Sequence, residues 1–292
     1  MPSIHTEAHI RQLVASQPLL SAAHRSQRAV AALNFYNAET LIAHVRAANA
    51  VGASIILQTT ESTIDYLGLG LAVAMARAAA AELDEPAALH LDHGGSYELA
   101  ERCVEAGYTS VMIDGSKLPF AENCAMTRRV VEMAHAHGVS VEGELGHVTH
   151  NDEPVADDIT SFYTRPADAR LFVEETGVDA LAVAIGTAHG FYKGEVRLDF
   201  ERLDRIRDAV EERAALVLHG GSGVPEELLR RAVAHGIRKI NFGTELKDAF
   251  TRAVKTTLAD TDEIDLRKTF APAIQAVQQV ATAKIMICRA GV

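Results

Sequence analysis

Short hydrophobic runs alternate along this chain with longer segments in which hydrophobic residues recur every three or four positions. Runs of this length are typical of buried β-strands, and the periodic segments are typical of helices that bury one face. The predicted strands are residues 29–34, 53–58, 87–91, 110–114, 139–144, 180–185, 215–218 and 237–241. Eight strands separated by helical segments indicate an α/β fold, a (β/α)8 TIM barrel.

The segments between the strands are predicted as helices, and five of them are followed by glycine. These helices are residues 39–51, 68–83, 96–106, 122–137, 167–177, 199–213 and 225–235. The glycines are Gly52, Gly107, Gly138, Gly177 and Gly236. Glycine readily adopts the left-handed conformation that ends many helices. Its regular position before a strand therefore agrees with a repeating β–α unit.

Three segments lie outside this repeat. Residues 6–16 are predicted as an extra N-terminal helix followed by a loop, and residues 245–288 as two or three C-terminal helices. Residues 145–165 form a long polar stretch, and a loop of this length on a compact barrel is usually functional, often as a lid. Since no linker or low-complexity segment interrupts the chain, residues 1–292 are predicted to form a single TIM-barrel domain.

The composition of the chain indicates which classes of partner and which cellular compartment to expect. With 48% hydrophobic residues the chain can bury a large core, and its formal net charge of -11 disfavours nucleic acid and anionic membranes. An anionic substrate would need a local positive site, such as a metal, a lysine or convergent backbone N–H groups. The three cysteines form no CxxC pair, which favours buried thiols in a reducing compartment. Because neither a signal peptide nor a hydrophobic run of ~18 residues is evident, we expect a cytoplasmic protein.

Polar residues gather where the predicted strands end, on the face that carries the active site in α/β barrels. Three of them are histidines that each end a strand and precede glycine: His93, His189 and His219. Three imidazoles on one rim, with a fourth position open, are typical of a catalytic zinc site. His90 lies before the end of its strand and is predicted to be structural.

Carboxylates accompany these histidines. Asp92 directly precedes the first of them, so it should lie near a bound metal and act as a general acid or base. Glu142 and Glu144 alternate onto the inner face of the fifth strand. Because a buried carboxylate needs a partner, Glu144 is assigned to the metal, and Glu142 and Asp114 to hydrogen bonds that hold the ligands. For Asp114 and Glu142, a buried hydrogen-bonding role without a metal is the alternative.

Glycine-rich turns follow the last two strands. The turn 220–223 reads GGSG, and residues 241–244 read NFGT. The loops after strands seven and eight form the usual phosphate site of these barrels, with backbone N–H groups as donors. Together with the histidines, they predict a metal-dependent enzyme that acts on a phosphorylated sugar.

These residues resemble those of the class II, zinc-dependent ketose-bisphosphate aldolases. The matching stretches lie in order over about residues 30–250 and are AALNFYNAET (31–40), LHLDHG (89–94), SVMIDGS (110–116), VSVEGELG (139–146), VDALAVAIGTAHG (178–190), LVLHGGSG (216–223) and KINFGTEL (239–246). Within the family, the chain looks most similar to the subgroup of tagatose- and some fructose-bisphosphate aldolases.

The resemblance implies a role for each matching residue. His93, His189 and His219 would bind Zn²⁺, and Asp92 would protonate the aldehyde oxygen in condensation and act as the base in cleavage. The residues that would bind the substrate and its phosphate are Asn34, Gly190, Lys193, Gly220, Gly221, Ser222, Asn241, Phe242, Gly243 and Thr244. Backbone oxygens near the phosphate would bind a monovalent cation, Na⁺ or K⁺.

The implied reaction is the reversible cleavage of tagatose or fructose 1,6-bisphosphate into dihydroxyacetone phosphate and glyceraldehyde 3-phosphate, a step of carbohydrate metabolism such as glycolysis. Zinc would stabilise the enediolate as a Lewis acid, so no Schiff-base lysine is needed. The resemblance further implies a homo-oligomer, a dimer or a tetramer.

One loop departs from the family pattern. Residues 146–153 read GHVTHNDE, so Thr149 and His150 replace a glycine pair and Asp152 stands where relatives carry glutamate. The base that removes the carbon-bound proton is therefore Asp152, Glu153 or neither. This departure leaves two alternatives: an aldolase for another ketose phosphate, or a metal- and phosphate-binding barrel with impaired catalysis. A zinc hydrolase with the same histidines is a further alternative, which the phosphate-binding glycines and Asp92 disfavour.

Overall fold

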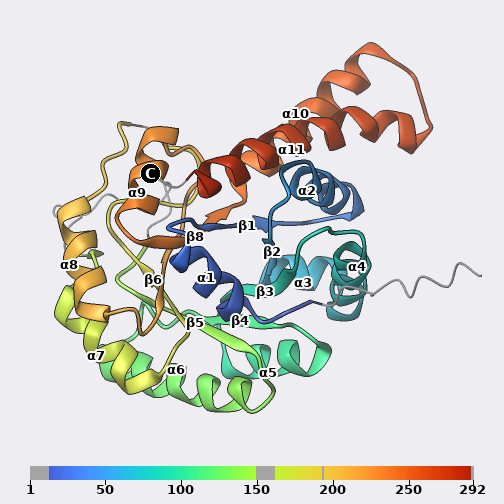
Figure 1. Ribbon diagram of the computed structural model, residues 1–292. Coiled ribbons are helices and arrows are strands. Elements are labelled where there is room, and N and C mark those ends of the chain that lie inside the picture. Colours follow the sequence, from blue (N-terminus) through green and yellow to red (C-terminus); the bar gives the residue numbers. More distant parts are fainter. Residues whose placement is uncertain (1–12, 149–161, 193, 291–292) are drawn as a thin grey trace, which may run out of the picture.

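The computed structural model describes residues 13–148, 162–192 and 194–290, in which eight parallel strands close into a barrel surrounded by helices (Figure 1). The strands are β1 (Val30–Asn34), β2 (Ile55–Thr60), β3 (Ala87–Gly94), β4 (Ser110–Ile113), β5 (Ser140–Leu145), β6 (Ala180–Val183), β7 (Ala215–Leu218) and β8 (Ile237–Phe242). Each strand pairs with the next, and β8 pairs with β1 to close the ring. All eight predicted strands are confirmed; the largest difference is in β3, which is predicted to end at residue 91 and reaches Gly94.

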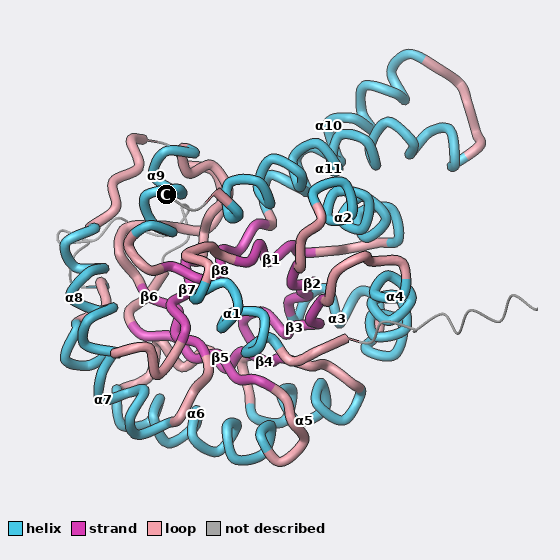
Figure 2. The backbone as a smooth tube through the Cα atoms, in the orientation of Figure 1, coloured by secondary structure: helices cyan, strands magenta, loops and turns pink. Residues whose placement is uncertain are grey.

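Helices surround this ring of strands (Figure 2). Between the strands lie α2 (Ala38–Val51), α3 (Glu61–Leu67), α4 (Leu69–Ala81), α5 (Tyr97–Ala106), α6 (Phe120–His135), α7 (Pro166–Thr176), α8 (Phe200–Val210) and α9 (Glu226–Ala234). The sequence pattern does not predict α3, because its 7 residues form only about two turns and show no helical period. Gly52, Gly107 and Gly177 adopt left-handed conformations directly after α2, α5 and α7, as expected.

The N-terminal helix differs from the prediction. An extra helix precedes β1 as predicted, but α1 spans Ser16–Arg25, where mostly a loop is predicted, and residues 13–15 of the predicted helix 6–16 are not helical. In Figures 1 and 2, α1 lies over the centre of the ring. It places Leu19, Leu20 and Ala23 in one hydrophobic cluster with strand residues. The spacing of these residues puts them on one face of α1, and this face packs on the strands.

Two helices complete the chain, in agreement with the predicted two or three: α10 (Thr244–Asp260) and α11 (Leu266–Arg289). They pack against each other, α11 also packs against α2, and their far ends project from the barrel (Figure 1). Ile264 and Leu266, near the connection between the two helices, are exposed. Among the described residues no single helix is long and apolar enough to cross a membrane, although α3 and α4, bent by 97°, meet that test as a pair.

Side chains that point into the barrel change character along the strands. Near the amino end they are small and apolar, and with α1 they form the cluster of Ala32, Ile56, Ala88, Ala180, Ala182 and Val217. Because side chains alternate along a strand, the face of β3 that carries Ala88 also carries His90 and Asp92. The polar inward-facing residues therefore come together at the carboxyl ends of the strands.

Candidate active site

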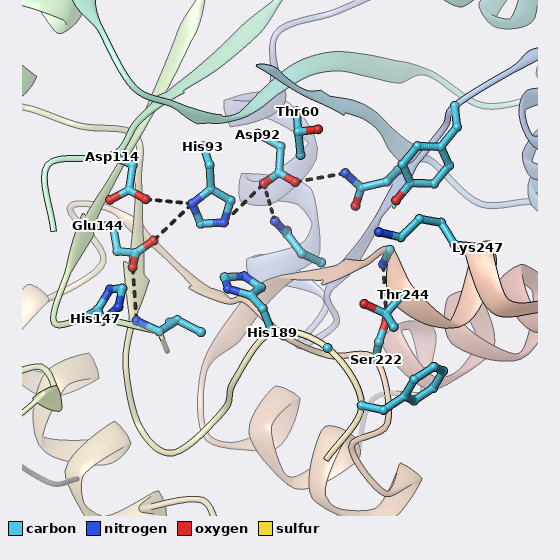
Figure 3. A pocket seen from close by; sticks show the side chains of 18 of the residues that line it. Thr60, Asp92, His93, Asp114, Glu144, His147, His189, Ser222, Thr244 and Lys247 are labelled. Atoms are coloured by element: carbon cyan, nitrogen blue, oxygen red, sulfur yellow. Dashed lines mark hydrogen bonds and ion pairs between the residues drawn. The ribbon is translucent and has the colours of Figure 1, made fainter. Parts of the chain in front are cut away.

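A cavity of about 650 Å³ lies at the carboxyl ends of the strands, and Figure 3 looks into it. The predicted site residues that line it are Asn34, Asp92, His93, Asp114, Glu144, His189, Gly190, Gly220, Ser222, Asn241, Gly243 and Thr244. Four others are buried and are not among the lining residues: Glu142, His219, Gly221 and Phe242. Asp152, Glu153 and Lys193 lie outside the described residues.

The three predicted histidines converge at this cavity. One ring nitrogen each of His93, His189 and His219 lies within 4.8 Å of the others. The backbone of His93 is left-handed, with a φ of 54°, in a region that non-glycine residues adopt uncommonly. A Cβ on Gly94 would lie 2.5 Å from the carbonyl oxygen of Met112. The glycine after His93 is therefore required by the close approach of β4.

Two carboxylates determine which ring nitrogen of His93 and of His219 faces the other histidines. His93 Nδ1 lies 2.9 Å from Asp114 Oδ2, and His219 Nε2 lies 2.8 Å from Glu142 Oε1. With these nitrogens donating, the remaining nitrogens carry lone pairs, and His93 Nε2 lies only 3.0 Å from His219 Nδ1. Two lone pairs so close repel each other unless a cation or a proton lies beside them. The donor set therefore fits a metal ion bound by imidazole nitrogens.

The charges around this cluster also favour a cation. Although burial opposes it, Asp92, Asp114 and Glu144 raise the pKa of His93 to about 9. Burial, together with Asp114, raises the pKa of Glu144 to about 8. Glu144 Oε2 is buried and has no hydrogen-bond partner among the described residues, and it lies 3.6 Å from His219 Nδ1. His93, Asp114 and Glu144 form a second group whose ligand atoms lie within 4.8 Å of one another.

Asp92 is held on the opposite side of His93 by three amides. Its Oδ2 accepts hydrogen bonds from Asn34 Nδ2 at 3.0 Å and Gln58 Nε2 at 3.2 Å, and its Oδ1 accepts one from Asn241 Nδ2 at 3.0 Å. Burial alone would favour the neutral acid, but His93 and other neighbouring cations lower the pKa of Asp92 to about 2. Asp92 is therefore an oriented carboxylate, with Oδ1 3.8 Å from His93 Nε2.

The other side of the cavity presents the amino end of helix α10. Thr244, its first residue, lines the cavity together with Lys247 from its first turn, and the Lys247 ammonium lies 5.5 Å from the centre of the Tyr36 ring. Ser222 Oγ accepts hydrogen bonds from the backbone N–H groups of Gly243 and Glu245 and ties the two glycine-rich turns together. A helix amino end with a lysine beside it attracts anions, a phosphate above all.

Comparison with known proteins agrees with this geometry. The family described as fructose-bisphosphate aldolase class-II matches residues 14–291. The chain belongs to this class II aldolase family. It is an aldolase, a lyase that acts on carbon–carbon bonds, as the sequence motifs indicate, and its family is generally metal-dependent.

Solved structures support the same assignment. The YdjI aldolase from Escherichia coli K12 shares 32% identity with this aldolase, with 96% of this chain and 98% of that chain covered at a TM-score of 0.83. A putative fructose-1,6-bisphosphate aldolase from Coccidioides immitis shares 29% identity over 93% and 94% of the two chains, with a TM-score of 0.82. Fructose-bisphosphate aldolase from Campylobacter jejuni, at 22% identity over 95% and 96%, has a TM-score of 0.79 and shows the shared fold.

Several residues of the aldolase cavity are not among the predicted site residues. Gln58 holds Asp92, although the sequence marks it only as a polar strand end. The side chains of Tyr36, Lys117, His147 and Lys247 also line the cavity. Lys247 could have been found, because it lies one helical turn after Thr244 in the predicted phosphate loop. Lys117 and His147 directly follow the matching stretches 110–116 and 139–146, and the fold brings them to the cavity from loops after β4 and β5.

Proposed function

We propose that this aldolase uses Zn²⁺ to cleave a ketose 1,6-bisphosphate, of the tagatose or fructose type, reversibly into dihydroxyacetone phosphate and glyceraldehyde 3-phosphate. The observation that carries the proposal is the pair of facing imidazole nitrogens of His93 and His219, 3.0 Å apart, in a cavity that also presents the amino end of α10. Zn²⁺ suits a set of three imidazoles with an open position. The helix end and its lysine suit a phosphate on the substrate.

The metal would be held by His93, His189 and His219, with Glu144 as a further carboxylate within reach. When bound, it supplies a Lewis acid that stabilises negative charge on the ketose oxygens. Asp114 and Glu142 keep one nitrogen of His93 and one of His219 as donors, so that the other nitrogen is available as a ligand. These two carboxylates thus orient His93 Nε2 and His219 Nδ1 toward the proposed site, where the second proton of His93 would be displaced by a bound metal.

Asp92 performs the proton transfer at the substrate hydroxyl. In cleavage it takes the proton from the hydroxyl next to the breaking bond, and in condensation it returns this proton to the aldehyde oxygen. Its low pKa keeps it ionised and ready to accept a proton, while Asn34, Gln58 and Asn241 fix its direction. General acid or base catalysis of this kind contributes about 10²–10⁴-fold to a rate.

The phosphate of the dihydroxyacetone half would lie between the two glycine-rich turns. Gly220, Ser222, Gly243 and Thr244 line this side of the cavity. A Cβ on Gly220 would lie 2.5 Å from the carbonyl oxygen of Ala188, so this turn needs a glycine. We assign Lys193 and the backbone of Gly221 and Phe242 to the same phosphate, and a Na⁺ or K⁺ ion to backbone oxygens nearby.

The base for the carbon-bound proton is assigned to Asp152 or Glu153 in the loop after β5. Since Thr149 and His150 replace the glycine pair of relatives there, cleavage of another ketose phosphate is a second candidate function. We further propose a cytoplasmic homo-oligomer, a dimer or a tetramer. Three buried free cysteines support a reducing compartment, and exposed Leu258, Ile264 and Leu266, on the C-terminal helices and their connection, support contacts between subunits.

A coupled assay for dihydroxyacetone phosphate tests the proposal. The zinc-loaded protein is given fructose 1,6-bisphosphate and tagatose 1,6-bisphosphate in parallel reactions. Release from either sugar supports the proposed reaction, and the ratio of kcat/KM values identifies the preferred stereochemistry. Zinc binding without release from either sugar would overturn it in favour of another ketose phosphate or of an impaired binding protein.

A further inference from the structure

A continuous series of polar side chains runs through the interior of the barrel below the three histidines. Lys239, on β8, is only 1% exposed, and its Nζ lies 2.6 Å from Glu142 Oε2 and 3.2 Å from His90 Nε2. His90 Nδ1 lies 2.7 Å from Ser110 Oγ, which lies 2.9 Å from Ser16 Oγ of α1. The series therefore connects the helix at the amino end of the barrel to Glu142 and, through it, to His219.

The chemistry of these groups determines the direction of each hydrogen bond. An ammonium only donates, so Lys239 donates to Glu142 and to His90 Nε2. His90 Nδ1 then carries the proton and donates to Ser110 Oγ, and between Ser110 and Ser16 either hydroxyl can be the donor. Glu142 accepts from Lys239 with one oxygen and from His219 with the other. From Lys239 to Glu142, His219 and His90, each group therefore has a defined role as donor or acceptor.

We propose that Lys239 is a positioning residue for the metal ligand His219, and that it acts through Glu142. The inference rests on the proposed metal site. A carboxylate buried this deeply, at 2% exposure, keeps its place only if a cation faces it. With one oxygen held by Lys239, the other oxygen is aimed at His219 Nε2, and His219 Nδ1 faces His93. Without the ammonium, the carboxylate loses the partner that holds it in this direction.

The test measures metal affinity and so does not depend on turnover. Lys239→Met keeps the length of the side chain and removes the ammonium. Zn²⁺ affinity is measured by competition with a chromophoric chelator, and the ligand field is read from the visible spectrum of the Co²⁺-loaded protein. Groups that orient metal ligands typically contribute 10–100-fold to metal affinity, so we expect a loss of about that size and an altered Co²⁺ spectrum.

A double variant tests whether Lys239 acts through Glu142. Glu142→Gln combined with Lys239→Met buries a neutral pair, which also protects folding if Lys239→Met alone is too unstable. If Lys239 works only through the carboxylate, Lys239→Met should change Zn²⁺ affinity by less than about threefold in the Glu142→Gln background. A full additional loss in that background would overturn the proposed route.

Leu203→Ala provides the matched control for general destabilisation, because Leu203 is fully buried in α8, outside the polar series. It should lower the Tm and leave Zn²⁺ affinity within about twofold of wild type. The inference is overturned if Lys239→Met behaves like this control, with a lower Tm and unchanged affinity. If wild type itself binds no Zn²⁺, the proposed metal site fails, and the inference fails with it.

Discussion

The two ends of the barrel interior are built from the same strands but have opposite characters. At the amino end, Ala88 of β3 and Val217 of β7 lie in an apolar cluster that α1 covers with Leu20. Two residues after Ala88 comes His90, and two residues after Val217 comes His219. Both histidines are buried among charged groups. The alternation of side chains thus selects the inward-facing residues, and the position along the strand decides whether they form core or site.

This difference separates stability from function. Burial of apolar side chains at the amino end stabilises the fold, whereas each buried carboxylate and ammonium at the carboxyl end must be paired to be tolerated. The aldolase satisfies this need with the pairs Lys239–Glu142 and His93–Asp114. Substitutions at the two ends should therefore affect different measurements.

The largest effect is expected from removing the metal. Treatment with a chelator should abolish cleavage of the sugar substrate in the cavity, because the protein ligands alone supply no Lewis acid. Added Zn²⁺ should restore this activity. The fold should not depend on the metal, because the apolar amino end of the barrel remains packed. The far-UV circular dichroism spectrum, which should be unchanged, is therefore the control in this experiment. Borohydride added with substrate should trap no covalent adduct. A trapped lysine would show that the reaction proceeds through a Schiff base instead.

Asp92→Ala should have the next largest effect. Loss of the proposed general acid and base should lower kcat by about 10²–10⁴-fold, while zinc content, measured by metal analysis, stays at the wild-type level. Asp208→Ala, on the outer helix α8, serves as the control and should keep full activity. An active Asp92→Ala enzyme would show that another group transfers the proton.

Leu20→Ala probes the amino end. Leu20 is 1% exposed in the contact between α1 and the strands, so the substitution should lower the free energy of unfolding by about 2–5 kcal/mol. Denaturant titration measures this loss, and kcat/KM should remain within about twofold of wild type. A large loss of kcat/KM in the folded variant would mean that the two ends of the barrel are coupled.

The smallest effect concerns His44 in α2, on the outside of the barrel. Burial lowers its pKa to about 3, and neither ring nitrogen has a hydrogen-bond partner among the described residues. Because the pKa in the unfolded chain is about 6.5, the folded state loses stability as pH falls below that value, by up to about 1.4 kcal/mol per pH unit. His44→Leu should remove this contribution. Unfolding curves at pH 7 and pH 5 measure it, and an unchanged slope would contradict the prediction.

Much of the fold is evident from local patterns. Hydrophobic runs and the glycines before strands identify all eight strands, because burial and left-handed helix ends depend on nearby residues. His93 is identifiable from its place at the end of a strand and before glycine, and the structure shows that the close approach of β4 requires this glycine. The sequence by itself therefore determined the barrel, the three histidines and the glycine-rich turns.

Only the tertiary structure decided which groups meet inside the barrel. Closing β8 against β1 brings Asn241 to Asp92, and crossing the interior brings Lys239 to Glu142. Such pairs are separated by about a hundred residues or more and leave no periodic trace in the chain. The position of α1 is likewise set by the apolar end of the barrel that it covers. The partners of each buried charge are thus a property of the closed ring, because closure alone determines which inward-facing side chains share its interior.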